Sequence, residues 1–191
     1  MLEKKDIIVS LRSRLLDDRF FHSLNVADMA KELALIYGED PDKAYLAGLV
    51  HDCTKNTPPE KQLEIIESGG IKLSELERRN KKLWHAISGS VFIKSEYGIE
   101  DEAVISAVRY HTTGKAGMSL LQKIIYTADF TSAERDYEGV ERIRTLAKTK
   151  LDSAVYEGAL FTVEKLEGLG LDVHPDTVDA MNYYKQKIDG R

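Results

Sequence analysis

The stretch Gly48–Lys55, GLVHDCTK, places a histidine and an aspartate side by side, directly after the apolar run YLAGLV at 45–50. An apolar run of this kind, within a chain of helical periodicity, is typical of a buried helix. Burying an imidazole and a carboxylate costs free energy unless each group is paired. We therefore expect His51 and Asp52 to face a partner inside a helical domain.

The segments around this stretch also have helical periodicity. Ile7, Leu11 and Leu15 recur at a spacing of four residues, which favours a helix with one buried face. Similar segments follow along the chain, including a long amphipathic stretch at 139–167 and a final helix at about 174–186. No alternation typical of strands and no internal repeat is present. The pattern predicts an all-α fold, a bundle of about eight to ten helices.

Length and composition narrow the class of protein. The chain has 191 residues, 42% of them hydrophobic and 31% charged, which predicts one globular domain over residues 1–191. No apolar run reaches the roughly 18 to 20 residues that would span a membrane, and the N-terminus lacks a signal-peptide core. The single Cys53 excludes an internal disulfide and fits a cytoplasmic location. The net charge of −5 argues against a nucleic-acid polymer as partner.

Four of the five histidines and two aspartates share one kind of setting. Each of them is flanked by apolar or small residues of a predicted helix. Imidazole and carboxylate groups are the ligands that suit first-row divalent metals, and helical bundles often build such sites from inward-facing side chains. The alternative is that each is a hydrogen-bonded core residue, and the spacing alone leaves both interpretations open. The candidate ligands are His22, His51, Asp52, His85, His111 and Asp129.

The sequence segments around these residues resemble those of a known family. The order of His22, His51-Asp52 and Asp129 on an all-α chain resembles the HD-domain metal-dependent phosphohydrolases. More narrowly, the chain is similar to the YqeK branch, the symmetrical diadenosine tetraphosphate hydrolases, over roughly residues 5 to 185. The matching sequence segments are DRFFHSLNVADMA (18–30), LAGLVHDCTK (46–55), WHAISGS (84–90), VRYHTTG (108–114) and IIYTADF (124–130).

The resemblance implies a site with two divalent metal ions. One ion would be held by His22, His51, Asp52 and Asp129. The second would be held by Asp52, which bridges the two, together with His85 and His111. In this type of family the ions are usually iron, and manganese, cobalt or magnesium can serve. A hydroxide bridging the metals would attack phosphorus, and diadenosine tetraphosphate would yield two ADP.

The phosphates of such a substrate call for nearby donors. Lys55, one turn after Asp52, is expected to act as a mobile positive charge in catalysis and in substrate binding. The other candidate contacts are Arg19, Arg109, Thr112, Thr113, Gly114 and Arg135. For each of them an ordinary ion pair or a helix-end role is the alternative. The implied partner is a small dinucleoside polyphosphate or another nucleotide, and the helix at 139–167 leaves a homodimer open.

Other functions stay open on the sequence alone. Enzymes of the HD type also cleave nucleoside monophosphates, cyclic nucleotides and the guanosine tetraphosphate alarmone. His85 and His111 favour a two-metal site over a one-metal alarmone hydrolase. A non-catalytic nucleotide-binding domain, or a structural helical module whose histidines belong to the core, would be the non-enzymatic alternatives.

Overall fold

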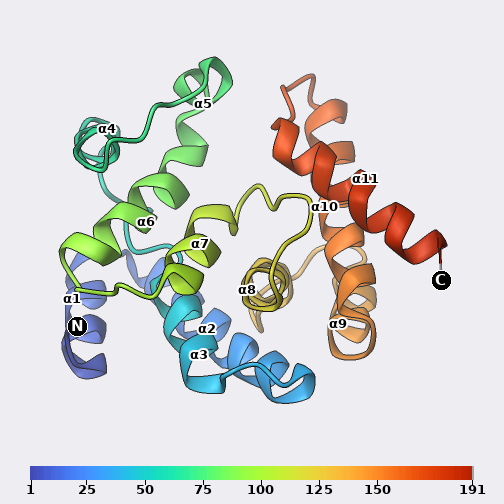
Figure 1. The fold of residues 1–191 in the computed structure, drawn as a ribbon, viewed down its shortest axis with the longest axis horizontal. Helices are drawn as coiled ribbons and strands as arrows, with labels where there is room; N and C mark the ends of the chain where they lie inside the picture. Colours follow the sequence, from blue (N-terminus) through green and yellow to red (C-terminus); the bar gives the residue numbers. More distant parts are fainter. Residues whose placement is uncertain (191) are drawn as a thin grey trace.

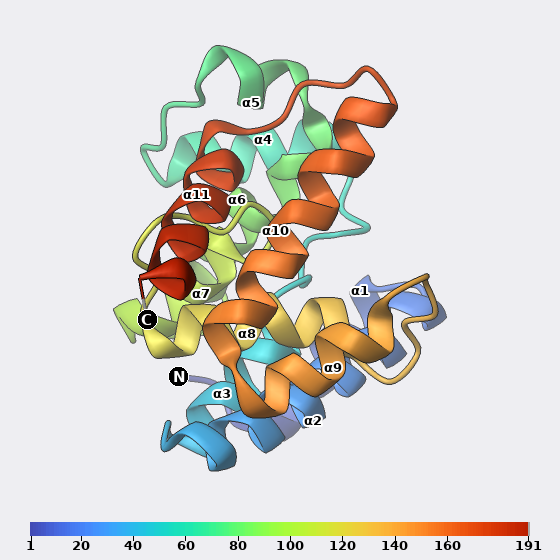
Figure 2. The same ribbon diagram turned by 90° about the vertical axis from the view of Figure 1, so that its right-hand side faces the viewer.

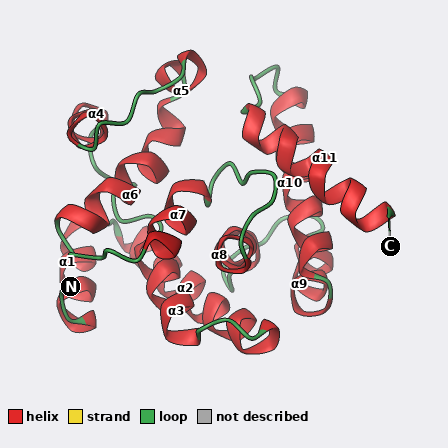
Figure 3. Ribbon diagram, in the orientation of Figure 1, coloured by secondary structure: helices red, strands yellow, loops and turns green. Residues whose placement is uncertain are grey.

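The architecture is entirely helical in the part of the chain that the computed structural model describes, residues 1–190. Figures 1 and 3 show helices joined by loops, and no strand occurs in this range. The all-α prediction is confirmed. The helices are α1 (Lys4–Arg14), α2 (Asp17–Tyr37), α3 (Pro41–Val50), α4 (Pro59–Ser68), α5 (Glu75–Arg79), the 3-10 helix η1 (Lys81–Leu83), α6 (Trp84–Ser95), α7 (Glu102–Tyr110), α8 (Leu120–Thr131), α9 (Val140–Thr149), α10 (Leu151–Gly168) and α11 (Pro175–Asp189).

The described residues form eleven α-helices, slightly more than the eight to ten expected. One reason is that the amphipathic stretch at 139–167 is divided into α9 and α10. Lys150 lies between them with φ −148° and ψ 73°, outside the helical region, so the chain changes direction there. Periodicity of apolar residues cannot reveal such a break, because both halves present a buried face.

Local capping explains where several helices begin. Asp40 accepts hydrogen bonds from the backbone N–H groups of Asp42 and Lys43 at 2.9 and 3.0 Å, and Pro41 occupies the first turn of α3. His174 caps α11 in the same manner, because its Nδ1 accepts from the N–H of Asp176 at 3.2 Å. The predicted helix start at His174 is therefore confirmed.

The helices form a bundle with α8 near its centre. Figure 1 shows α8 end-on, with α2, α3 and α7 on one side and α9, α10 and α11 on the other. In both Figures 1 and 2, α10 and α11 lie side by side along one flank. The largest apolar core joins α1, α2, α3, α6, α7 and α8 and extends to residues of α9 and α10, and a smaller one lies between α8, α10 and α11. No described helix has the length and apolar character required to cross a membrane.

A close approach between α2 and α3 brings two histidines together. A Cβ atom on Gly48 would lie 2.8 Å from the Cα atom of Ala27, so only glycine lets the two backbones approach this closely. Gly48 lies one turn before His51, and Ala27 lies on the same helix as His22. The contact therefore positions the end of α3 against the middle of α2, where both imidazoles point inward.

Candidate metal centre

Five helices bring the six candidate ligands to one place. His22 is on α2, His85 on α6 and Asp129 on α8, whereas His51 and His111 occupy the residues that end α3 and α7. We call the set the histidine–aspartate cluster. All its members are buried except Asp129, whose side chain is 19% exposed. The cluster consists of His22, His51, Asp52, His85, His111 and Asp129.

The first half of the cluster surrounds His22. Its Nε2 atom lies 3.1 Å from Asp129 Oδ1 and 3.2 Å from His51 Nε2. The Oδ2 atom of Asp52 lies 3.7 Å from His51 Nε2 and 4.0 Å from His22 Nε2. Ligand atoms of His22, His51 and Asp129 all lie within 4.8 Å of one another, a spacing that a single ion can bridge.

The second half uses the other oxygen of Asp52. Asp52 Oδ1 lies 3.2 Å from His85 Nε2 and 3.5 Å from His111 Nε2, and those two nitrogens are 3.2 Å apart. Asp52 thus presents one oxygen to each pair of imidazoles. A carboxylate can do this and an imidazole cannot, since the two nitrogens of an imidazole ring point in different directions.

Hydrogen bonds at Nδ1 orient the imidazoles. The Nδ1–H groups of His51, His85 and His111 donate to the carbonyl oxygens of Gly48, Lys82 and Val108, three residues earlier, at 2.6, 2.8 and 2.7 Å. With the proton on Nδ1, each Nε2 presents a lone pair to the cluster. This arrangement of an anchored Nδ1 and a free Nε2 is the usual one in metal-ligating histidines.

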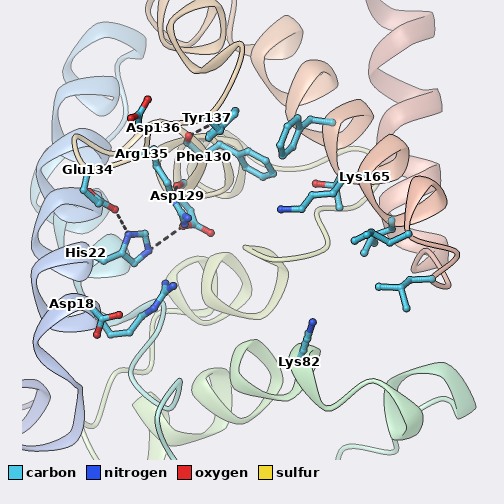
Figure 4. A pocket seen from close by; sticks show the side chains of 16 residues that line it. Asp18, His22, Lys82, Asp129, Phe130, Glu134, Arg135, Asp136, Tyr137 and Lys165 are labelled. Atoms are coloured by element: carbon cyan, nitrogen blue, oxygen red, sulfur yellow. Dashed lines mark hydrogen bonds and ion pairs between the residues drawn. The ribbon is translucent and has the colours of Figure 1, made fainter.

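His22 is anchored by a carboxylate instead. Its Nδ1 contacts Glu134 Oε1, and that carboxylate is held in place by Ser132 Oγ at 2.8 Å and Asn25 Nδ2 at 2.7 Å. Figure 4 shows His22 between Glu134 and Asp129. Burial lowers the pKa of His22, but the hydrogen bonds to Asp129 and Glu134 outweigh it and raise the pKa to about 8.

Burial and charge keep His51, His85, Asp52 and Asp129 in the form that binds metal. Burial lowers the pKa of His51 to about 4 and that of His85 to about 3, so both are neutral near pH 7. Burial alone would raise the pKa of Asp52, but the imidazoles of His51 and His85 hold it well below its usual range. The same opposition, led by the hydrogen bond from His22, keeps the pKa of Asp129 low.

The donor set fits divalent cations. Asp52 Oδ1 is buried and has no hydrogen-bond partner among the described residues, since the imidazoles that face it carry their protons on Nδ1. A buried carboxylate oxygen without a donor is rare in proteins and requires a cation or another partner. Imidazole nitrogen together with carboxylate oxygen suits iron, manganese and other first-row metals.

Three predicted cations border the cluster. Arg19 Nη1 donates to Asp52 Oδ2 at 3.1 Å, and Arg135 pairs with the Asp129 carboxylate while its Nε donates to the Asp129 carbonyl at 2.8 Å. Lys55 Nζ lies 3.0 Å from His85 Nε2 and 3.8 Å from Asp52 Oδ1. Arg135 therefore pairs with a cluster aspartate rather than with the acids that follow it in sequence.

Different residues of the loop after α7 contact different parts of the protein. Thr112 Oγ1 lies 3.1 Å from the Nε2 atoms of both His85 and His111, so it borders the cluster. Thr113 Oγ1 donates to the Gly114 carbonyl at 2.9 Å, and the Thr113 carbonyl accepts from Thr177 Oγ1 at 2.9 Å. The hydrogen bond between Thr177 and Thr113 holds the loop against α11.

Gly114 and Arg109 also have structural contacts. Gly114 has φ +62°, and a Cβ atom there would lie 3.2 Å from the Tyr126 ring. Its presence is thus explained by the backbone and by close packing. Arg109 donates to Glu77 on α5 at 2.7 Å. The structure does not bring Arg109, Thr113 or Gly114 to the ligands by any contact of their side chains.

A pocket of about 680 Å³ opens beside the cluster. Among its lining residues are His22, Asp129, Arg19 and Arg135, so it is continuous with the candidate site (Figure 4). Its volume is within the range of small-molecule sites. The sequence analysis missed Glu134 as an anchor of His22, and it also missed the pocket's aromatic side chains. Glu134 is 112 residues from His22, and no local pattern signals that contact.

Comparisons with known proteins identify the family of this chain. The HD domain family matches residues 19–134, which contain the whole cluster. The chain is 34% identical to "Bis(5'-nucleosyl)-tetraphosphatase, symmetrical" from Bacillus subtilis, over 95% of this chain and 97% of the relative. A relative of the same name from Halalkalibacterium halodurans is 37% identical over 90% and 91% of the two chains.

A solved structure is similar over almost the whole chain. It is the crystal structure of a predicted HD superfamily hydrolase involved in NAD metabolism from Clostridium acetobutylicum. The two chains are 40% identical with a TM-score of 0.95, and the similarity covers 98% of this chain and 99% of the other. Together with the cluster, these similarities show that the chain belongs to the HD-domain family, in the group that contains the symmetrical bis(5'-nucleosyl)-tetraphosphatases.

Proposed function

We propose that this protein is a metal-dependent phosphohydrolase that cleaves diadenosine tetraphosphate symmetrically to two ADP. The observation that carries the proposal is the position of Asp52, whose two oxygens face two separate pairs of inward-pointing imidazoles. The relatives named as symmetrical tetraphosphatases support the choice of substrate. His85 and His111 complete the second pair of imidazoles, which favours this proposal over a one-metal alarmone hydrolase.

The cluster would hold two divalent ions. One would be held by His22, His51, Asp52 and Asp129, and the other by Asp52, His85 and His111. When bound, such ions would supply a water nucleophile at neutral pH and stabilise the charge on the phosphoryl oxygens. The nitrogen-rich donor set supports iron or manganese over magnesium, which prefers oxygen ligands.

The chain's own residues would position and neutralise the polyphosphate. Arg19, Lys55, Thr112 and Arg135 border the cluster, and each keeps N–H or O–H groups that can turn to a phosphate oxygen. Phosphoryl transfer depends mostly on positioning and charge compensation, which such donors provide. Water adds to the second phosphorus, the central P–O–P bond breaks, and one ADP leaves while the other retains the new oxygen.

Product analysis tests the proposal. The protein would be purified without chelator and incubated with diadenosine tetraphosphate and iron(II) or manganese(II), and the products would be separated by chromatography. We expect ADP as the only nucleotide product and about two metal ions per chain. AMP with ATP would show that cleavage is asymmetric. Turnover of mononucleotides or of the alarmone alone would move the protein to another branch of the family.

An Asp52→Ala variant tests the site itself. We expect it to lose hydrolysis and metal binding while it keeps its helical content in circular dichroism, since Asp52 faces both halves of the cluster. Full activity of this variant would disprove the two-metal assignment. The single domain, the cytoplasmic location, the lack of a nucleic-acid partner and a homodimer stay predictions from the sequence.

A further inference from the structure

The pocket beside the cluster has an aromatic wall made of three residues. Phe130 lies on α8, Tyr137 in the α8–α9 connection and Phe161 on α10, and all three line the pocket. The ring centroids of Tyr137 and Phe161 are 4.8 Å apart at an interplanar angle of 34°, and Phe130 meets Phe161 edge-on at 6.4 Å. Tyr137 Oη donates to the Phe130 carbonyl at 3.0 Å, so the orientation of its ring is fixed.

Leucines line another part of the same pocket. Leu166 is on α10, and Leu169 and Leu171 follow in the turn toward α11. Leu169 is 64% exposed and Leu171 is 49% exposed. Two large apolar side chains that are exposed at the edge of a pocket contribute little to the core and are typical of a binding surface. The outer part of the pocket thus offers apolar and aromatic surface to a flat ligand.

Two lysines face the open space of the pocket. In Figure 4, the side chains of Lys82 and Lys165 point into the pocket from different sides. Neither forms an ion pair with a carboxylate among residues 1–190, and Lys165 Nζ lies 5.7 Å from the Phe161 ring centroid. Their positive charges are therefore available to an anionic group.

The inner end of the pocket has a different chemistry. There His22 and Asp129 of the cluster lie next to Arg19 and Arg135. Metal-binding and cationic groups, an aromatic wall and two lysines thus line one pocket, and Figure 4 shows Phe130 and Tyr137 beside Asp129 and Arg135. These groups suit the parts of a nucleoside polyphosphate, in which the phosphates are anionic and the base is flat and apolar on its faces.

We propose that Phe130, Tyr137 and Phe161 form the subsite for one nucleobase of the dinucleoside polyphosphate, while Lys82 and Lys165 face the phosphates next to it. The proposal rests on the proposed function, because it places one half of that substrate. The wall offers ring faces, which every base can stack on, so it selects purines over pyrimidines by area more than adenine over guanine.

Binding of two simple ligands tests this subsite without turnover. ADP carries a base and pyrophosphate does not, whereas both can reach the inner end of the pocket. Their dissociation constants would be measured by calorimetry with the manganese-loaded protein and with Phe161→Leu and Phe161→Tyr. Leucine keeps an apolar side chain without an aromatic face, and tyrosine keeps the face. Phe21→Leu is the matched control, because Phe21 is 56% exposed and lies outside the pocket.

We expect Phe161→Leu to bind ADP roughly tenfold more weakly, the scale of one lost base–aromatic stack, and to bind pyrophosphate as the wild type does. Phe161→Tyr and the control should bind both ligands normally. Tyr137→Leu should repeat the base-specific loss if Phe161→Leu fails to fold, as judged from its melting temperature.

Two results would overturn the subsite. One is a wild-type protein that binds ADP no more tightly than pyrophosphate. The other is a variant that weakens both ligands equally or neither of them. The proposed function fails separately, since it requires ADP to be formed from diadenosine tetraphosphate. A protein that fails to cleave that compound but shows the base-specific loss would keep the subsite and lose the assigned reaction.

Discussion

Removal of the Glu134 carboxylate should weaken one metal site and spare the other. Glu134 contacts Nδ1 of His22, and His22 lies in the half of the cluster that contains Asp129. Its carboxylate does not contact His85 or His111, whose Nδ1 atoms are held by backbone carbonyls. A Glu134→Ala change therefore frees the His22 ring to rotate and leaves the second half of the cluster intact.

The magnitude follows from the role of such an anchor. Loss of a group that orients a metal-ligating histidine typically lowers metal affinity about 10- to 100-fold, or about 1.4 to 2.7 kcal/mol. Because metal binds the native state, the stabilisation gained at a given metal concentration should fall by a similar amount. Glu134→Gln should have a smaller effect, since its amide oxygen can still accept from Nδ1–H.

The assay is a manganese titration against a competing chromophoric chelator, with metal per chain measured on the same samples. Wild type should show two binding events, and Glu134→Ala should show one of them weakened. Glu138→Ala, a change at an exposed carboxylate in the same connection between α8 and α9, is the matched control. If Glu134→Ala bound manganese with the same affinities as the wild type, the anchoring role of Glu134 would be refuted. Equal weakening of both binding events would refute the division of the cluster into two halves.

Three further predictions concern the stability of the protein. A Gly48→Ala change should destabilise the fold by roughly 1 to 3 kcal/mol in urea unfolding, because the new Cβ atom would lie 2.8 Å from the Cα atom of Ala27. An unchanged midpoint of urea unfolding would mean that α2 and α3 can move apart without a cost in stability. An Asp152→Asn change should cost about 1 to 3 kcal/mol at neutral pH, because Lys123 and Lys187 pair with Asp152 at 2.8 and 3.1 Å. Burial opposes ionisation of Asp152, yet these ion pairs hold its pKa below the ordinary value, so the contribution is present above about pH 4 and is lost as pH falls through the lower native pKa. Thermal melts of the two proteins should therefore converge in acid, and a constant difference would contradict the ion-pair explanation. Removal of metal by a chelator should lower the melting temperature of the protein as purified. An unchanged melting temperature would indicate that the histidines are core residues that bind no metal.

Several features of this protein could be predicted from local sequence because their causes are local. Apolar spacing such as that of Ile7 and Leu11 predicts helices, and His174-Pro175 predicts the start of the last one. The sequence segments around His22, His51-Asp52 and Asp129 predict a shared site, since imidazoles and carboxylates on buried helix faces require partners. The structure brings these groups together.

Other features depended on the tertiary structure. Thr112, Thr113 and Gly114 are adjacent in sequence, yet only Thr112 borders the cluster, because Thr113 and Gly114 pack toward α11. Arg109 lies two residues before His111 and pairs with Glu77, 32 residues away. Neighbours in a chain point in different directions, and which of them meets the site depends on the packing of distant helices.

The same reason explains what the sequence did not reveal. The Glu134–His22 contact and the wall of Phe130, Tyr137 and Phe161 join residues from helices and connections far apart in the chain. A phenylalanine on an amphipathic helix has the same local pattern whether it fills a core or lines a pocket. The residue types and their helical setting left a metal site and core histidines both open, and the family resemblance favoured the metal site, whereas the Glu134 anchor of His22 and the shape of the pocket arise only when distant helices such as α2, α8 and α10 pack together.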